Sequence, residues 1–280
     1  MRLQACLPLL ALLSACSASP RPQALRICAD PNNLPYSDRR LEGFENRIAG
    51  LIAAALRLPL RYTWWPHRPG FLRNTLDAGA CDVIMGAPAG YDRLSLTLPY
   101  YRSTYVFLSR RDRGIELHSF DDAALRSLRI GVQLIGADAE STPPVHALSR
   151  RGIIRNVVGY LVYGDQSRAN PLSNIVDAVA SGEVDVAIVW GPPAGYFATR
   201  ETVPLRLDAI AASDEDGDLP QAFDIAIGVR RGNDALRAAI DGVLLRRRAE
   251  IDRILDQFGV PRIERELEPP LVQVQIALAR

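Results

Sequence analysis

Side chains able to carry out acid–base or nucleophilic chemistry are few and widely spaced in this sequence. All 33 basic residues are arginines, so a mechanism that needs a lysine base or a lysine Schiff base is excluded. Asp165, and Asp138 with Glu140, are the acids that could act in proton transfer, although a lone acid in a polar loop is usually a turn residue. The signatures of serine hydrolases, phosphate-binding loops, dinucleotide-binding folds and zinc peptidases do not occur. We therefore expect no enzymatic activity.

A metal site is not expected either. The stretch SDEDGDLP places Asp214, Asp216 and Asp218 at alternate positions, as a calcium-binding loop does. Such a loop needs glycine at its sixth position and glutamate at its twelfth, where this chain has Leu219 and Ile225. The histidines are too scattered to complete a zinc site with two cysteines; they are His67, His118 and His146. The sequence predicts neither a metal nor a cofactor.

Aromatic side chains are the most prominent candidates for binding. Several stand where predicted strands end and a hydrophobic core thins out: Trp64, Trp65, Trp190, Tyr91 and Tyr196. Such rings offer a large contact area with a polar tip, which suits an apolar or planar ligand or a loop of a partner protein. The set is extended by further aromatic residues, part of which we expect in the core: Tyr36, Phe71, Tyr100 and Tyr101.

The first half of the chain alternates between predicted strands and helices. Hydrophobic spacing indicates strands at 24–31, 60–65 and 81–86, and helices at 43–59 and 68–79. This β-α-β-α-β order is typical of a parallel sheet with helices on its faces.

The second half repeats that order. Strands are predicted at 128–134, 156–164 and 184–191, with helices at 144–151 and 173–181. Between and after the two halves lie other segments: extended stretches at 99–111 and 222–232, one or two helices within 233–259, and a tail at 263–280 that fits an edge strand, a packed segment or disorder.

The two halves also share a sequence pattern. GACDVIMGAPAGYD (79–92) and GEVDVAIVWGPPAGYF (182–197) both run from Gly through Asp-Val to a glycine-proline turn that ends in Ala-Gly-Tyr. The tripeptide Leu-Arg-Ile begins 57 positions before the Asp of Asp-Val in both copies. Chance similarity is the alternative, but the equal spacing favours two related lobes.

An organisation in two lobes predicts a cleft between them. We expect one lobe from 25–107 and 226–280 and the other from 108–225, joined by the two extended stretches as crossing strands. Open α/β sheets bind ligands beyond the carboxyl ends of their strands, so the two echoed strand ends are expected to face each other across this cleft.

Residues 1–24 are predicted to be an export leader and linker, because one Arg is followed by an apolar stretch too short to span a bilayer stably. LSAC, ending at Cys16, is similar to the lipobox of bacterial lipoproteins, so we expect lipidation of Cys16; ordinary cleavage after Ala18 is the alternative. Outside the cytoplasm, Cys28 and Cys81 are expected to form a disulfide if their strands are neighbours. Two buried, unreactive thiols are the other possibility.

The charge pattern excludes one class of partner. The formal net charge is +1, and basic and acidic residues are interspersed. The sequence therefore has no cluster of basic residues that would bind nucleic acid or an anionic membrane surface. Membrane contact is expected only through a lipid anchor.

Several motifs resemble those of known proteins. YDRLSLTLPYYRSTYVFL, GEVDVAIVWGPPAGYF and FDIAIGVRRGNDALRAAID are similar to a crossing, a later strand and a return crossing of the type 2 periplasmic solute-binding proteins. CADPNNLPYS, GFENRIA, YTWWP, GFLRNTLDAGACDV and VWGPPAGYFA together resemble the MxaJ/XoxJ type, encoded beside quinoprotein methanol dehydrogenases. The resemblance covers essentially the whole mature chain.

The resemblance implies the α/β fold of type 2 periplasmic binding proteins, with two lobes of parallel or mixed sheet joined by two crossing strands. It also implies no enzymatic activity and a partner, a methanol dehydrogenase that uses pyrroloquinoline quinone (PQQ) with calcium or a lanthanide. The lipobox is a departure from what the family implies. The cleft residues we predict are Asn33, Tyr36, Trp64, Trp65, Phe71, Pro88, Tyr91, Arg93, Tyr100, Asp165, Trp190 and Tyr196.

The family also contains amino-acid importers, which suggests other functions. Arg93 lies near the position of the arginine that binds the α-carboxylate in those importers, but their acid for the α-amino group would fall near Trp190. An ammonium group buried without a partner is costly, so we predict that common amino acids bind poorly. The alternatives to a dehydrogenase accessory protein are the receptor of an ABC importer for a small organic solute and an enzyme similar to the lytic enzymes or dehydratases of this fold. The sequence offers the enzyme no paired acid and base.

Overall fold

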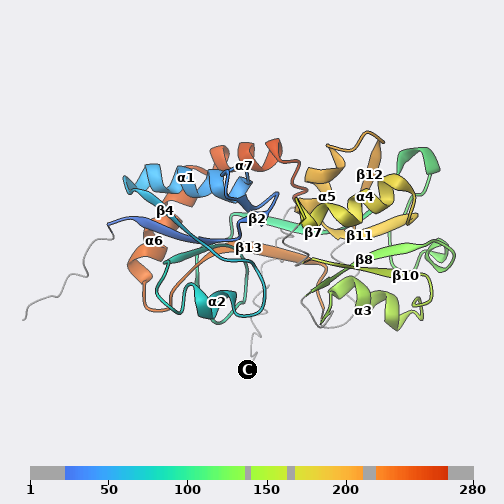
Figure 1. The fold of residues 1–280 in the computed structure, drawn as a ribbon, viewed down its shortest axis with the longest axis horizontal. Coiled ribbons are helices and arrows are strands. Elements are labelled where there is room, and N and C mark those ends of the chain that lie inside the picture. The colour runs from blue at the N-terminus through green and yellow to red at the C-terminus, as the bar shows by residue number, and fades with distance from the viewer. Residues whose placement is uncertain (1–22, 136–139, 163–167, 211–218, 264–280) are drawn as a thin grey trace, which may run out of the picture.

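The computed structural model describes residues 23–135, 140–162, 168–210 and 219–263 of this chain. Two lobes lie side by side along the long axis of the molecule, and helices cover both faces of the sheet that they share (Figure 1). Several predicted features lie outside the described residues: the leader with Cys16, Asp138, Asp165, the acidic positions from Asp214 to Asp218, and the tail beyond residue 263.

Three parallel strands form the centre of the first lobe: β1 (Leu25–Ala29), β4 (Leu60–Trp64) and β5 (Val83–Pro88). β1 lies between the other two, with Ile27 opposite Tyr62 on one side and Val83 on the other. Nearly every β1 side chain is buried, as expected for a parallel strand covered by helices on both faces.

The helices of the first lobe are unequally divided between the faces of its sheet. α1 (Phe44–Leu56) and α7 (Arg248–Gln257) lie on one face, and the single turn α2 (Phe71–Asn74) lies on the other (Figure 1). α6 (Asp234–Arg246) packs against α1 and α7. The apolar residues of α1 recur every three or four positions and are buried: Phe44, Ile48, Ala49, Ile52 and Ala53.

The start of α1 is fixed by a glycine and an asparagine. The Asn46 side chain accepts the main-chain N–H groups of the N-cap residue Gly43 (3.2 Å) and of Asp38 in β3 (3.1 Å). A Cβ on Gly43 would collide with the main-chain carbonyl of Tyr36, so only glycine fits there. The loop after β1 is thereby held against the helix.

The second lobe has the same central arrangement. Its parallel strands are β8 (Ile130–Ile135), β10 (Val157–Leu161) and β11 (Val186–Trp190), with β8 in the middle. α4 (Asn174–Ser181) and α5 (Gly191–Ala198) lie on one face and α3 (Pro143–Arg150) on the other (Figure 1).

Two long strands cross between the lobes, β7 (Tyr101–Arg110) and β13 (Ala222–Val229). They pair with each other between Tyr101–Thr104 and Ala222–Ile225; β7 then continues along β11, while β13 continues along β5. One mixed sheet results, in the order β10-β8-β11-β7-β13-β5-β1-β4. The two-crossing fold predicted from the sequence is confirmed, and the predicted lobe boundaries, after residues 107 and 225, fall within these two strands.

Shorter elements complete the described chain. They are the strands β2 (Asn32–Asn33), β3 (Ser37–Asp38), β6 (Ser95–Leu96), β9 (Glu140–Ser141) and β12 (Leu205–Ala209) and the 3-10 turns η1 (Arg111–Arg113), η2 (Ala123–Arg126) and η3 (Pro171–Ser173). No helix within the described ranges is long and apolar enough to cross a membrane.

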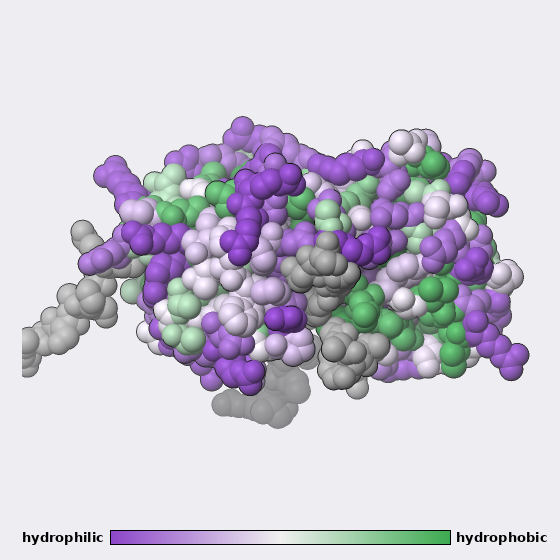
Figure 2. All heavy atoms as spheres, in the orientation of Figure 1, coloured by the Kyte–Doolittle hydropathy of each residue, from purple (hydrophilic) through white to green (hydrophobic). Residues whose placement is uncertain are grey.

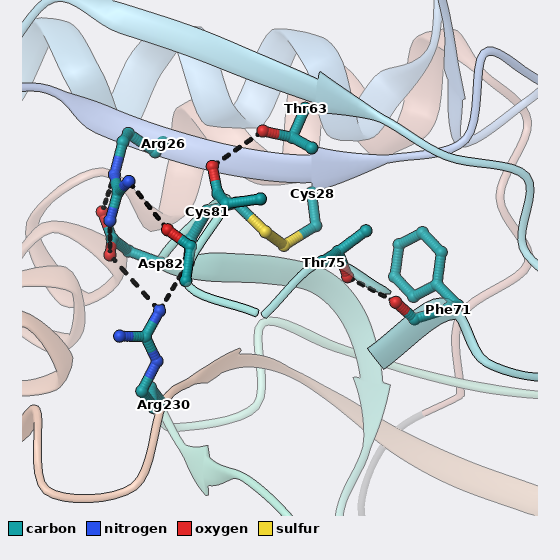
Figure 3. The surroundings of a disulfide bond; sticks show 10 residues. Arg26, Cys28, Thr63, Phe71, Thr75, Cys81, Asp82 and Arg230 are labelled. Atoms are coloured by element: carbon teal, nitrogen blue, oxygen red, sulfur yellow. Dashed lines mark hydrogen bonds and ion pairs between the residues drawn. A yellow bond between two sulfur atoms is a disulfide. The ribbon is translucent and has the colours of Figure 1, made fainter. Parts of the chain in front are cut away.

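A disulfide joins two neighbouring strand segments of the first lobe (Figure 3). Cys28 in β1 and Cys81 just before β5 have Cα atoms 5.5 Å apart. Around the bond lies a small apolar cluster, which includes Phe71, Leu76 and Ile84. On the solvent side of this cluster the Arg26 guanidinium pairs with both carboxylate oxygens of Asp82. The disulfide therefore holds β1 and the start of β5 together, and the carboxyl ends of these two strands border the cleft.

Two segments differ from the sequence prediction. The helix predicted at 68–79 is only the single turn α2, because Gly70 is in the left-handed region and the chain leaves helical geometry at Thr75. The glycine-proline turn predicted after β11 is the buried helix α5. Its prolines stand in the first helical turn, where a missing N–H does no harm.

Candidate functional site

The carboxyl ends of both sets of parallel strands meet at the crossing strands. In the first lobe, the main-chain N–H of Ala89, just after β5, donates to the Asp224 carbonyl in β13 (2.8 Å). In the second lobe, β11 ends at Trp190, which is paired with Tyr105 of β7. The strand ends therefore border one region with the β7–β13 pair at its base, which is the place where open α/β sheets bind ligands.

Trp190 is the centre of an aromatic cluster at this base. Its ring lies edge-on to Tyr105 of β7, with ring centroids 5.3 Å apart, and edge-on to Phe223 of β13, at 5.7 Å. Trp190 and Phe223 are half-buried, whereas Tyr105 is buried. One indole from the second lobe thus contacts both crossing strands, the segments that would bend if the lobes moved.

A buried carboxamide holds the main chain of Trp190 in place. The Gln133 side-chain oxygen accepts the Trp190 N–H over 2.8 Å, and the Gln133 carbonyl accepts the Thr142 hydroxyl, also over 2.8 Å. Gln133 and Thr142 are both buried. The end of β11 is therefore fixed to β8 and to the start of α3, and the indole is presented from a rigid support.

The first lobe contributes half-buried aromatic rings. Trp64 at the end of β4 stacks on Tyr62, with centroids 4.7 Å apart, and the Arg39 guanidinium lies over its ring at 5.9 Å. Trp65 packs on the apolar cluster around the disulfide. Tyr36 packs on Phe44 at 5.4 Å. These rings keep part of their surface accessible.

Three of the predicted cleft residues lie in the core instead. Phe71 belongs to the disulfide cluster, Tyr100 is 1% exposed, and Tyr196 stacks on Phe258, just after α7, at 5.5 Å. Each ring is turned inward by a partner distant in the sequence. The cleft surface that we propose below omits these three residues.

The structure does not bring the other predicted cleft residues together as one group. Tyr91 packs beside the disulfide cluster, far from the Phe258 contact of Tyr196, so the two echoed tyrosines are not paired. The Arg93 guanidinium forms an ion pair with Asp77 at 2.8 Å, and both side chains are largely exposed. Pro88 is exposed at the end of β5, and Asn33 is half-buried in β2.

The lobes touch across the region as well as at its base. The Asn32 carboxamide in β2 donates to the Arg168 carbonyl at 2.8 Å and accepts the Asn170 main-chain N–H at 3.3 Å. Figure 2 shows one face of the molecule, with apolar side chains gathered on part of the second lobe. Leu161, at the end of β10, is 48% exposed.

An unusual carboxyl group lies near the end of β5. The side chain of Glu45, in the first turn of α1, is packed against Gly86, a residue in the left-handed region that has no room for a Cβ. Burial raises the pKa of Glu45 to about 8, and the neighbouring Tyr100 hydroxyl offsets only part of that rise. Burial therefore favours the neutral form of this carboxyl group.

Asp30, a buried acid just after β1, is occupied by the main chain. Its two carboxylate oxygens accept the N–H groups of Asn32 (2.7 Å) and His67 (2.6 Å). Within the described ranges no group of three or more His, Cys, Asp or Glu residues is placed to hold a metal ion. The arrangement is suited to contact with rings and apolar side chains.

Comparison with known proteins agrees with this geometry. Residues 25–261 match the family of bacterial extracellular solute-binding proteins, family 3. The chain belongs to this family. It is 30% identical to protein MoxJ of Methylorubrum extorquens over 253 residues, which cover 88% of this chain and 83% of that protein. It is 29% identical to protein MoxJ of Paracoccus denitrificans, covering 85% of this chain and 88% of that protein.

Solved structures of the family show the same fold. The periplasmic binding protein XoxJ from Methylobacterium extorquens AM1 superposes with a TM-score of 0.71 at 32% identity, covering 86% of this chain and all of that one. MxaJ from Methlophaga aminisulfidivorans MPT superposes with a TM-score of 0.72 at 25% identity, with the same coverage. The MxaJ/XoxJ resemblance inferred from the sequence motifs is confirmed.

Sequence reasoning missed two members of the aromatic cluster. Tyr105 and Phe223 lie inside the crossing strands, whereas the sequence prediction places binding residues at strand ends. The sequence does contain a signal, because both stretches are predicted to cross between the lobes and therefore to pass beneath any cleft. Gln133 and Asn32 carried no recognisable signal, since amides in loops and strand interiors are common.

Proposed function

We propose that this protein is a periplasmic accessory protein that binds a segment of a PQQ-dependent methanol dehydrogenase in the cleft between its lobes and so supports maturation or activation of that enzyme. The support is its family, its similarity to MoxJ, MxaJ and XoxJ, and its leader-like N-terminal sequence. The proposal includes no catalytic role and no cofactor of its own; PQQ and calcium or a lanthanide belong to the dehydrogenase.

The observation that carries the proposal is the cluster of Trp190, Tyr105 and Phe223 at the base of the cleft. Trp190 and Phe223 are half-buried and offer ring surface, while the buried ring of Tyr105 supports Trp190 from β7; such a site can anchor an aromatic or aliphatic side chain of a partner. Asp30 is occupied by main-chain N–H groups, and burial favours the neutral form of Glu45. An apolar protein segment fits such a surface better than a zwitterion does.

The proposed cleft surface consists of residues that keep accessible area: Asn33, Tyr36, Trp64, Trp65, Pro88, Tyr91 and Trp190, together with Phe223. Asp165 remains part of the prediction from sequence. A lipid anchor on Cys16 is part of the proposal, and it would hold the protein at the membrane surface.

Binding to purified dehydrogenase tests the proposal directly. The protein is immobilised, and the metal-free and the complete dehydrogenase are passed over it. We expect micromolar or tighter binding of at least one form, weakened at least tenfold by Trp190→Ala and unchanged by Leu245→Ala, which removes an apolar side chain 67% exposed on α6. No binding of either form, together with unchanged dehydrogenase activity in a strain that lacks this protein, would exclude the proposed function.

The receptor of an ABC importer is the second candidate. Two lobes joined by two crossing strands allow closure around a small solute, and this arrangement favours it. A small organic molecule retained through purification and identified by mass spectrometry would support the importer over the accessory role.

A further inference from the structure

Asn32 joins the two lobes through hydrogen bonds that do not involve the crossing strands. Its carboxamide uses both ends at once: Nδ2 donates to the carbonyl of Arg168 (2.8 Å) and Oδ1 accepts the N–H of Asn170 (3.3 Å). These partners are main-chain groups of the second lobe, more than 130 residues away in the chain. A single side chain thus imitates the paired hydrogen bonds of a neighbouring strand.

The first-lobe side of this contact is held firmly. Asp30, only 5% exposed, accepts the Asn32 N–H over 2.7 Å and the His67 N–H over 2.6 Å, and its carbonyl accepts the Ser37 hydroxyl over 2.9 Å. The loops that follow β1 and β4 are therefore tied to one buried carboxylate. The main chain from which the Asn32 side chain projects is therefore held in place.

The second-lobe side is equally specific. Asn170 has φ +53°, in the left-handed region, and Pro171 follows it at the start of η3. This backbone turn directs the Asn170 N–H out of the lobe. Asn170 is half-buried. A small separation of the lobes would therefore break its hydrogen bond to Asn32 while giving the N–H group little access to water.

We propose that Asn32 is a clasp that holds the lobes together without any ligand, and that a binding partner enters the cleft only when this clasp opens. The proposal rests on the proposed function only in taking the cleft as the binding site. Each neutral hydrogen bond contributes modestly, so loss of both is expected to shift the ratio of closed to open molecules by roughly tenfold. Asp30 acts through Asn32 as a positioning residue.

Hydrogen exchange and small-angle X-ray scattering of the ligand-free protein test the clasp. In Asn32→Ala we expect amide exchange to rise roughly tenfold on both sides of the cleft, in 32–38 and in 168–175, with a larger radius of gyration. Asn32→Asp keeps the shape but replaces the donor to Arg168 by an oxygen, so it should open the lobes as well. Asn233→Ala, which removes a carboxamide that caps nothing at the start of α6, is the control and should change neither measurement.

The outcomes separate this proposal from the proposed function. Unchanged exchange and radius of gyration in folded Asn32→Ala overturn the clasp; if that variant does not fold, the same result in Asn32→Asp overturns it. Both measurements use the protein alone. An open Asn32→Ala that still binds no dehydrogenase would therefore leave the clasp standing and count only against the dehydrogenase as partner.

Discussion

Asp82 and Asp185 occupy the same position in the two lobes: each donates its main-chain N–H over 2.9 Å to the carbonyl of the arginine 56 residues earlier, Arg26 or Arg129. Their side chains differ. Asp82 pairs with the Arg26 guanidinium, whereas the Asp185 carboxylate accepts the Arg129 N–H over 2.8 Å. The main-chain hydrogen bond is therefore the same in both lobes, whereas the contacts of the aspartate side chain differ.

The same register continues into the strands. Ile27 pairs with Val83 in the first lobe, and Ile130 pairs with Val186 in the second, again 56 residues apart in both cases. β5 and β11 therefore enter the sheet at equivalent points and reach the crossing strands at equivalent ends. Beyond those ends the two lobes differ, because β5 is followed by a turn and β11 by the helix α5.

We predict that loss of the disulfide lowers stability without changing the fold. The bond closes a loop of 53 residues, and the chain-entropy model assigns such a loop roughly 4 kcal/mol. Urea unfolding of the Cys28→Ala, Cys81→Ala double variant should give a free energy of unfolding lower by this amount. Reductant should lower the free energy of unfolding of the wild type similarly and leave that of the variant unchanged. A variant as stable as the oxidised wild type would contradict the prediction.

A second prediction concerns the close contact between the lobes at α5. A Cβ on Gly195 would overlap the carbonyl of Gly259, a backbone group that cannot move aside as a flexible side chain can. Gly195→Ala should therefore destabilise the protein by about 1–3 kcal/mol or more.

The matched control is Gly50→Ala, in the middle of α1, where a Cβ meets no atom within 4 Å. Because alanine favours helix, this change should be neutral or stabilise by up to about 1 kcal/mol. Thermal unfolding followed by circular dichroism compares the two variants. Equal melting temperatures would show that the α5 contact is not tight.

The same contact explains why α5 could not be predicted from the sequence. The phrases after β5 and β11 have nearly the same letters, yet one continues as strand and turn while the other forms a buried helix. What distinguishes them is packing against Gly259 and Phe258, more than 60 residues later in the chain. Local propensity contains no such information.

The strands, the helices that cover them and the two crossings were predictable because their hydrophobic periodicity is local. The cleft was predictable only in part. The strand-end position of Trp190 could be read from the sequence, but whether a ring faces the cleft or the core depends on distant partners, as the buried Tyr100 and Tyr196 on Phe258 illustrate.

A third prediction concerns pH. The pKa of Glu45 is raised from 4.5 to about 8 in the folded protein, mainly by burial. Between these values the unfolded chain releases the proton while the folded protein keeps it, so stability falls as pH rises through this window. The contribution has a slope of at most about 1.4 kcal/mol per pH unit.

Glu45→Gln should remove this contribution, because the amide cannot ionise. Unfolding free energies from pH 4.5 to 8 should therefore decline more steeply in the wild type than in the variant. Glu42→Gln, at an exposed position in the loop before α1, serves as the control and should follow the wild type. Parallel curves for wild type and Glu45→Gln would show that the carboxyl group is better solvated than the structure indicates.

The last prediction is that common L-amino acids do not bind with micromolar affinity. An amino acid needs one cation for its carboxylate and one anion for its ammonium group, and both must be paired when they leave water. Arg93 is already paired with Asp77 at 2.8 Å, and Trp190 is surrounded by Tyr105 and Phe223 rather than by acids. Titration calorimetry with the twenty amino acids should give no heat of binding above that of dilution. A micromolar dissociation constant for any of them would mean that the cleft holds a pair of opposite charges and would favour the importer over the accessory protein.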